Sequence, residues 1–186
     1  MILIFLVKEV AVKRRIPSAT AVTAITTKMF SRFSKVLKGN RPFTLLLIIS
    51  GIFGLGAFNY SFILLKASNL GIDKDVIPLI YAIINISHTA IGIPTGILAD
   101  RIGKEKVLTI GYAVFVVSSS LMIIFTERGV AGADNFVYAS ILAAVFGIYV
   151  GISETVQRAL IPRYISSELR GTAYGVYNVV VGVGFL

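Results

Sequence analysis

The sequence predicts an all-α membrane protein, a polytopic bundle of transmembrane helices, from three observations. Of its 186 residues, 56% are hydrophobic and only 15% are charged, whereas soluble proteins average about 25% charged residues. The mean hydropathy is +0.86. The few charges gather between apolar runs that are long enough to cross the hydrocarbon layer as helices. The lipid bilayer is therefore the first partner that we expect.

Five segments without Asp, Glu, Lys or Arg are expected to be the membrane-spanning helices. The first four have about the 20 residues that a helix needs to cross roughly 30 Å of hydrocarbon. The fifth is apolar up to the last residue, as expected of a helix that has been cut short. The expected spans are about 43–65, 76–99, 107–126, 135–153 and 171–186.

The segment before the first full span divides into two parts. Residues 1–7 are apolar but too short to cross a bilayer, so we expect the end of a preceding transmembrane helix. A signal peptide is the alternative, but its basic residues would precede the apolar run and not follow it. Residues 8–42 are expected to form a basic cytoplasmic loop. Within it, residues 28–38 have an apolar and a basic face, which predicts an amphipathic helix on the membrane surface, with a partly helical linker as the alternative.

The distribution of Lys and Arg predicts the orientation. Fifteen of these residues fall on one side of the expected spans and three on the other. Short loops rich in Lys and Arg are retained in the cytoplasm. We therefore expect a multi-pass protein of the plasma membrane with residues 8–42 in the cytoplasm. The retention of Lys and Arg in cytoplasmic loops explains the net charge of +9. Nucleic acid is not an expected partner, because its binding needs a solvent-exposed basic face on a soluble fold.

The sequence offers little of the chemistry that membrane enzymes need. It contains no Cys, and His88 is its only His, so neither a thiolate metal site nor an HExxH zinc pair is possible. The G-x-S-x-G pattern of serine hydrolases is also missing. We expect no enzyme activity, no catalytic residue, no metal and no cofactor.

Small residues repeat every four positions in two of the spans. Such ridges let helices approach closely in a membrane. The two ridges consist of Ala143, Gly147 and Gly151, and of Gly171 and Gly175. A helix kink is expected at Pro94.

The run GILADRIGKEK at 96–106 separates the second and third expected spans. Gly96 allows a neighbouring helix to approach, and Gly103 allows a tight reversal of the chain. Asp100 places an anion at a helix end, where a cation or a helix N-terminus must compensate it. These features indicate a latch between helices, although the basic residues could serve topology alone.

This loop resembles the signature G-x-x-x-D-R/K-x-G-R/K-R/K of the major facilitator superfamily. The matching residues are Gly96, Asp100, Arg101, Gly103 and Lys104. Glu105 stands where the family usually has a second basic residue. The segment 153–175 is similar to the link between the tenth and eleventh helices of prokaryotic members.

The resemblance implies a major-facilitator-like half, the second half of a twelve-helix transporter. The chain would run from the end of helix six to part of helix eleven, and the missing N-terminal half would be its partner. A first-half assignment stays open, because that half carries the same loop signature. It would leave residues 1–7 without an explanation.

Charged residues at the cytoplasmic ends of the helices are expected to close an inner gate. Glu154 and Arg158 stand four residues apart, in the favourable order for an ion pair. We expect Asp100, Glu154, Arg158 and Arg170 to form one ion-pair network. A single exposed pair contributes only ~0–1 kcal/mol, so only a network that breaks in each cycle could bias the two states of a transporter.

Polar residues inside the spans are candidates for lining a cavity. Tyr81, Asn85 and His88 recur at intervals of three or four residues, and a polar helix face in hydrocarbon points to the bundle interior or to water. Hydrogen bonding between neighbouring helices is the alternative. The candidates are Asn59, Tyr60, Tyr81, Asn85, His88, Tyr149, Tyr174 and Asn178. None of the four full spans has a charge near its centre, so the charge of the substrate is not predicted.

The expected function is transport of a small-molecule substrate by a secondary transporter that uses alternating access. The substrate would lie near the midplane of the membrane, between this half and the partner half. The fragment alone is expected to be inactive, because half of the pathway wall is missing. The alternative is a small multi-span scaffold or assembly protein without transport.

Overall fold

The computed structural model describes residues 31–32, 34–37, 39–127 and 134–184, and its regular elements over these ranges are all helical. This confirms the all-α fold class. The helices are α2 (Arg41–Gly56), α3 (Tyr60–Asn69), α4 (Ile77–Ile102), α5 (Lys104–Glu127), α6 (Asp134–Tyr164) and α7 (Arg170–Gly184), with the short 3-10 helix η2 (Ser167–Leu169) before α7.

Four helical stretches are long and apolar enough to cross a membrane. They are Arg41–Asn69, which combines α2 and α3, and Ile77–Ile102, Lys104–Ile124 and Asn135–Tyr164. Large apolar side chains cover much of their outer surface, and Ile93 of α4 is 77% exposed. Such a surface belongs against lipid or against other helices.

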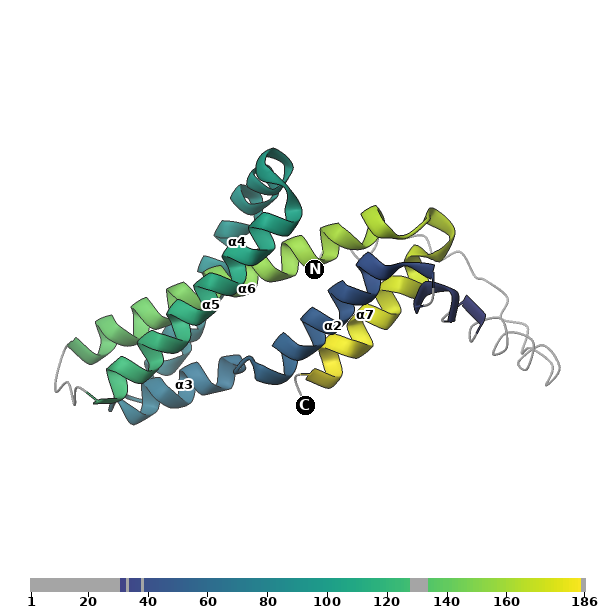
Figure 1. Ribbon diagram of the computed structural model, residues 1–186. Coiled ribbons are helices and arrows are strands. Elements are labelled where there is room, and N and C mark those ends of the chain that lie inside the picture. Colours follow the sequence, from purple (N-terminus) through teal and green to yellow (C-terminus); the bar gives the residue numbers. More distant parts are fainter. Residues whose placement is uncertain (1–30, 33, 38, 128–133, 185–186) are drawn as a thin grey trace, which may run out of the picture.

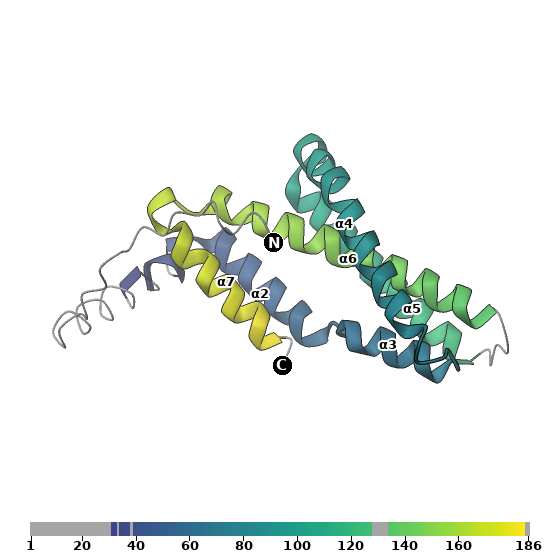
Figure 2. The same cartoon turned by 180° about the vertical axis from the view of Figure 1, so that it is seen from behind.

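The helix α6 is the centre of the bundle (Figures 1 and 2). Both α4 and α5 pack along it, while α2 and α7 lie side by side. One apolar core joins α2, α7 and the second half of α6, and it includes Phe43, Leu160 and Tyr177. The other core joins α3, α4 and the first half of α6, and it includes Ile84 and Phe146.

Two helices differ from the expected spans. The span expected at 43–65 is divided, because Ala57 has extended backbone angles and α3 begins only at Tyr60. The span expected to end at residue 153 continues as α6 to Tyr164. As a result, Glu154 and Arg158 lie within a helical stretch that is long and apolar enough to cross a membrane.

The expected ridge on α6 packs against α4. A Cβ atom built on Gly151 would lie 2.6 Å from the carbonyl oxygen of His88, and one on Gly147 would collide with the carbonyl oxygen of Ile84. The other ridge has no such contact, because a Cβ atom on Gly171 or Gly175 would meet nothing within 4 Å. The two glycines of α6 therefore permit the closest helix approach.

The start of the chain is described only in part. The expected helix end at 1–7 and the basic segment up to residue 30 lie outside the described residues. Within the expected amphipathic helix, residues 31–32 and 34–37 are helical. Val36 is fully buried in the core, while Arg32 and Lys35 are exposed. A surface position on the membrane stays a prediction.

Candidate functional site

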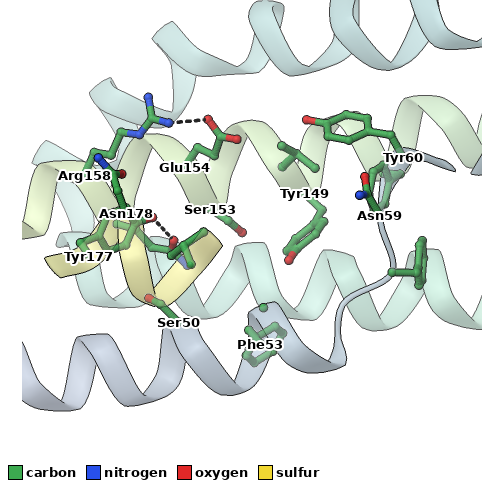
Figure 3. Close-up of a pocket in the computed structure, with 16 residues that line it drawn as sticks. Ser50, Phe53, Asn59, Tyr60, Tyr149, Ser153, Glu154, Arg158, Tyr177 and Asn178 are labelled. Carbon is green, nitrogen blue, oxygen red and sulfur yellow. Dashed lines mark hydrogen bonds and ion pairs between the residues drawn. The ribbon is translucent and has the colours of Figure 1, made fainter. Parts of the chain in front are cut away.

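A cavity of about 280 Å³ lies between the two cores, where α2 gives way to α3 (Figure 3). Its wall comes from α2, the break, the start of α3, α6 and α7. Six aromatic residues line it, namely Phe53, Phe58, Tyr60, Phe146, Tyr149 and Tyr177. The polar and charged lining residues are Ser50, Asn59, Ser153, Glu154, Gln157, Arg158 and Asn178. A largely apolar wall with a few polar groups is typical of small-molecule sites.

The break between α2 and α3 is held in place by aromatic contacts to α6. Phe58, in the break, stacks on Phe146 with ring centroids 5.2 Å apart and an interplanar angle of 19°. Tyr60 meets the same ring edge-on at 5.5 Å. Non-helical backbone is tolerated at membrane depth only where protein or a cavity surrounds it. The break and the cavity are therefore parts of one feature.

Two opposite charges enter the cavity from α6. Arg158 Nη2 lies 3.2 Å from Glu154 Oε2, and the side chains are 60% and 41% exposed. His88 of α4 brings Nε2 to 4.0 Å from the same carboxylate oxygen. Ionisable residues inside a transmembrane helix usually face a pathway or a water-filled cavity. This arrangement is the strongest indication of a functional site.

A buried hydrogen-bonded chain crosses the bundle beside the cavity. The hydroxyl of Tyr177 on α7 donates to Gln157 Oε1. Gln157 Nε2 on α6 donates to the hydroxyl of Tyr112 on α5 at 3.0 Å. The ring of Tyr112 stacks on Phe53 of α2 at 3.6 Å. Gln157 and Tyr112 were not expected as site residues, although Gln157 follows Tyr149 and Ser153 at intervals of four residues.

Gln157→Leu should lower the free energy of unfolding by about 1–2 kcal/mol, because the hydroxyls of Tyr112 and Tyr177 lose their partner on α6. Thermal unfolding of the detergent-purified protein measures this loss. Thr109→Val is the matched control, since among the described residues its hydroxyl donates to one group, the carbonyl of Glu105 in its own helix. Equal shifts in the two variants would contradict the role of Gln157 as a link between helices.

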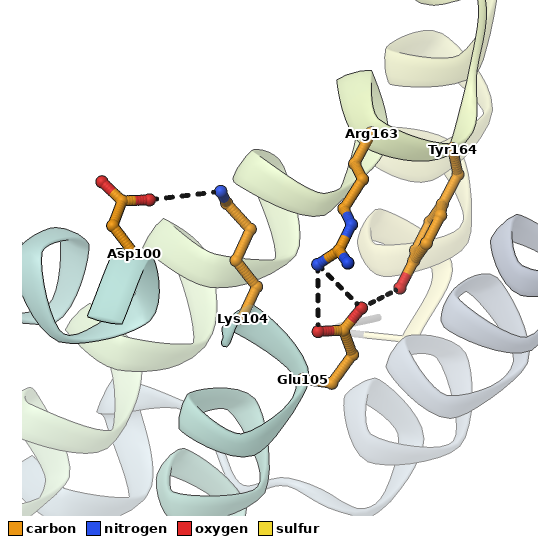
Figure 4. Close-up of polar contacts among 5 residues, drawn as sticks. All are labelled: Asp100, Lys104, Glu105, Arg163 and Tyr164. Carbon is orange, nitrogen blue, oxygen red and sulfur yellow. Dashed lines mark hydrogen bonds and ion pairs between the residues drawn. The ribbon is translucent and has the colours of Figure 1, made fainter. Parts of the chain in front are cut away.

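The structure brings together only two residues of the expected four-residue gate network. Glu154 and Arg158 form an ion pair, whereas Asp100 pairs with Lys104 at 3.3 Å in its own hairpin (Figure 4). Arg170 donates to the backbone carbonyls of Ile165 and Pro162. Asp100 and Arg170 therefore have other partners in this conformation.

Glu105 makes the contact between the signature loop and α6 (Figure 4). Its carboxylate lies 3.1 Å from Arg163 Nη1, and it accepts a hydrogen bond of 2.8 Å from the hydroxyl of Tyr164. The start of α5 is thereby tied to the end of α6. In the sequence, Glu105 stands out only as a departure from the signature, and its partners were not expected.

The other expected site residues fall into two groups. Asn59, Tyr60, Tyr149 and Asn178 lie at the cavity wall. Tyr81, Asn85, His88 and Tyr174 do not line this cavity. Asn85 bonds to the carbonyl of Tyr81 in its own helix, and Tyr174 donates to the carbonyl of Arg158 at 3.1 Å. Gly96, Arg101 and Gly103 lie at the end of α4 and in the turn to α5, and Gly103 has the positive φ of 99° that favours glycine.

Comparison with known proteins places these features in a family. The model of the Major Facilitator Superfamily matches residues 1–186. The chain belongs to this superfamily. The family assignment confirms the resemblance noted in the signature loop.

Several curated proteins are similar to this major facilitator chain. An uncharacterized MFS-type transporter of Methanocaldococcus jannaschii, MJ1317, is 33% identical over 146 residues, which are 75% of this chain and 34% of that protein. The uncharacterized proteins Mb2288 of Mycobacterium bovis and Rv2265 of Mycobacterium tuberculosis are each 28% identical over 132 residues, 71% of this chain and 28% of theirs. The chain thus spans about a third of the length of these relatives. No solved structure gives a significant match.

The ionic contact at Glu105 distinguishes this major facilitator chain from the usual signature. A second basic residue at this position would face Arg163 with a like charge. Like charges at such a distance are destabilising. We therefore interpret Glu105 and Arg163 as a matched pair in this chain.

Exchanging the charges of this pair tests the interpretation. Glu105→Arg should lower thermal stability by ~0.5–1 kcal/mol through repulsion, the scale of an exposed pair. The double variant Glu105→Arg and Arg163→Glu should recover most of the loss, because the attraction is restored. The double-mutant cycle compares the Tm values of the wild type, Glu105→Arg, Arg163→Glu and the double variant. Additive losses in the double variant would show that the two residues do not interact.

Proposed function

We propose that the protein acts as a secondary transporter that moves a small solute across the plasma membrane by alternating access. The observation that carries the proposal is the opposed charge pair Glu154 and Arg158, inside a span, at an aromatic cavity beside a broken helix. Broken helices near the midplane are where many transporters bind their substrates. The superfamily match supports the same function.

The geometry supports a pathway that needs a second half-bundle. Large apolar side chains of α4 are uncovered, and Ile86 and Ile93 are 67% and 77% exposed. We propose that the N-terminal half of the same transporter packs against this chain and supplies the rest of the pathway wall, so that residues 1–186 alone are inactive. The basic end of the bundle, with residues 8–42, would face the cytoplasm.

A transport assay on the complete gene product tests the proposal. Proteoliposomes would be offered a panel of radiolabelled sugars, amino acids, organic cations and organic anions, with and without an imposed proton gradient. We expect saturable accumulation of at least one class, and its loss in protein truncated to residues 1–186. Failure to move any panel member, together with stable co-purification of another membrane protein, would favour the scaffold alternative.

A further inference from the structure

The ion pair in the cavity has hydrogen-bonding capacity that the protein does not use. Glu154 Oε2 receives Arg158 at 3.2 Å and lies 4.0 Å from His88. Glu154 Oε1 has no hydrogen-bonding partner among the described residues, and over the same ranges the guanidinium of Arg158 contacts this one carboxylate alone. Figure 3 shows both groups at the cavity, with the Tyr60 hydroxyl directed towards Glu154. A carboxylate oxygen and several N–H groups therefore remain available to a ligand.

A structural role explains little of this arrangement. Glu154 and Arg158 stand on the same helix, so their attraction joins no two elements. An i,i+4 pair stabilises a helix by only about 0.2–0.5 kcal/mol. Ionisable residues are rare in apolar helices of membrane-spanning length, and they usually mark a substrate or ion pathway. Both charges at the cavity are therefore better explained by a ligand that uses them.

We propose that this pair selects a zwitterionic solute with an aromatic or apolar body; the inference rests on the transport function proposed above. The ammonium group of the solute donates to Glu154 Oε1, and its carboxylate accepts from the free N–H groups of Arg158. Charges then alternate in sign and the net charge of the site stays zero. A singly charged solute would leave a net charge in the cavity, which is costly where the dielectric constant is low.

The rest of the cavity fits the body of such a solute. Tyr60, Phe146 and Tyr149 present aromatic rings to the same cavity as Glu154. Aromatic and apolar groups pack favourably against these rings. The volume of about 280 Å³ suits a molecule of the size of a single amino acid.

Three molecules that share one phenyl ring test the selection by charge. L-Phenylalanine is a zwitterion, 2-phenylethylamine lacks the carboxylate, and 3-phenylpropionate lacks the ammonium group. Calorimetric titration of the purified complete protein should show L-phenylalanine binding at least about tenfold more tightly than either analogue. Similar affinities for all three, or no binding of L-phenylalanine up to ~10 mM, would overturn the proposal.

Two variants test whether Glu154 binds the ammonium group of the ligand and Arg158 its carboxylate. Glu154→Gln gives the site a net positive charge, so the preference should shift towards 3-phenylpropionate. Arg158→Gln should shift it towards 2-phenylethylamine. Arg41→Gln removes an exposed charge outside the cavity and should keep the original order. A uniform loss of affinity for all three ligands in both cavity variants would mean that the pair is only structural.

The binding and transport assays separate the two proposals. Charge-selective binding without accumulation of any solute in proteoliposomes would overturn the transport function and leave the zwitterion site standing. Saturable transport of solutes regardless of their charge would support the transport function and overturn the zwitterion site.

Discussion

Gly151→Ala is expected to separate α4 from α6 and to reduce the yield of folded protein severely. The added methyl carbon would lie 2.6 Å from the backbone carbonyl oxygen of His88 and would also collide with Ile91. A backbone oxygen cannot rotate away, so one helix must move. Overpacking of this kind costs ~1–3 kcal/mol, and the contact between α4 and α6 is the most extensive in the bundle. Gly147→Ala should act in the same way.

Gly175→Ala provides the matched control. This glycine also lies within a helix, but its added methyl group would meet nothing within 4 Å. Alanine is the better helix former, so we expect unchanged or slightly higher stability. The monodisperse fraction in size-exclusion chromatography and the Tm in detergent measure both variants. Equal behaviour of Gly151→Ala and Gly175→Ala would show that α4 and α6 are not packed as closely as described.

Hydropathy predicted the helices that have uniform apolar sequences. The spans expected at 76–99 and 107–126 correspond to α4 and α5, because both are bounded by charges that cannot enter lipid. The turn between α4 and α5 was also predicted, and Gly103 adopts the positive φ that the tight reversal requires. These features depend on local composition and on single residues.

Two features of the helices were not expected from charge and composition. The span expected to end at residue 153 was bounded by the charge of Glu154, whereas the helix α6 continues to Tyr164, and Glu154 pairs with Arg158 within it. The break after Gly56 lies in a run without charged residues, just before Asn59, and Phe58 in the break stacks on Phe146 of α6. The absence of charges alone predicts neither feature.

Among the site residues too, those recognised by their own polarity were predicted, and those defined by a distant partner were not. Tyr149 and Tyr60 were expected from their polarity inside a span, and they lie at the cavity wall. The bond between Gln157 and Tyr112 joins residues 45 positions apart, and the pair of Glu105 with Arg163 joins residues 58 positions apart. Only the packing of α5 against α6 brings such partners together.

Asp100→Lys is expected to abolish transport by the complete protein while leaving it folded in the membrane. In the structure Asp100 is 76% exposed, and its ion pair is with Lys104 one turn along the chain. An exposed pair contributes ~0–1 kcal/mol, so its loss should hardly change the Tm. The additional lysine also reinforces the basic side of the bundle and preserves topology.

A large effect on transport therefore requires a second partner for Asp100 in another conformation of the cycle. The expected network with Arg158 or Arg170 is such a partner, since this conformation leaves Asp100 open on the side away from Lys104. Glu168→Lys is the control, because it makes the same charge change at an exposed residue near α7. Initial uptake rates, normalised to the protein in the membrane, compare the two variants. Transport by Asp100→Lys at the rate of Glu168→Lys would mean that the signature loop sets topology and does not latch the helices.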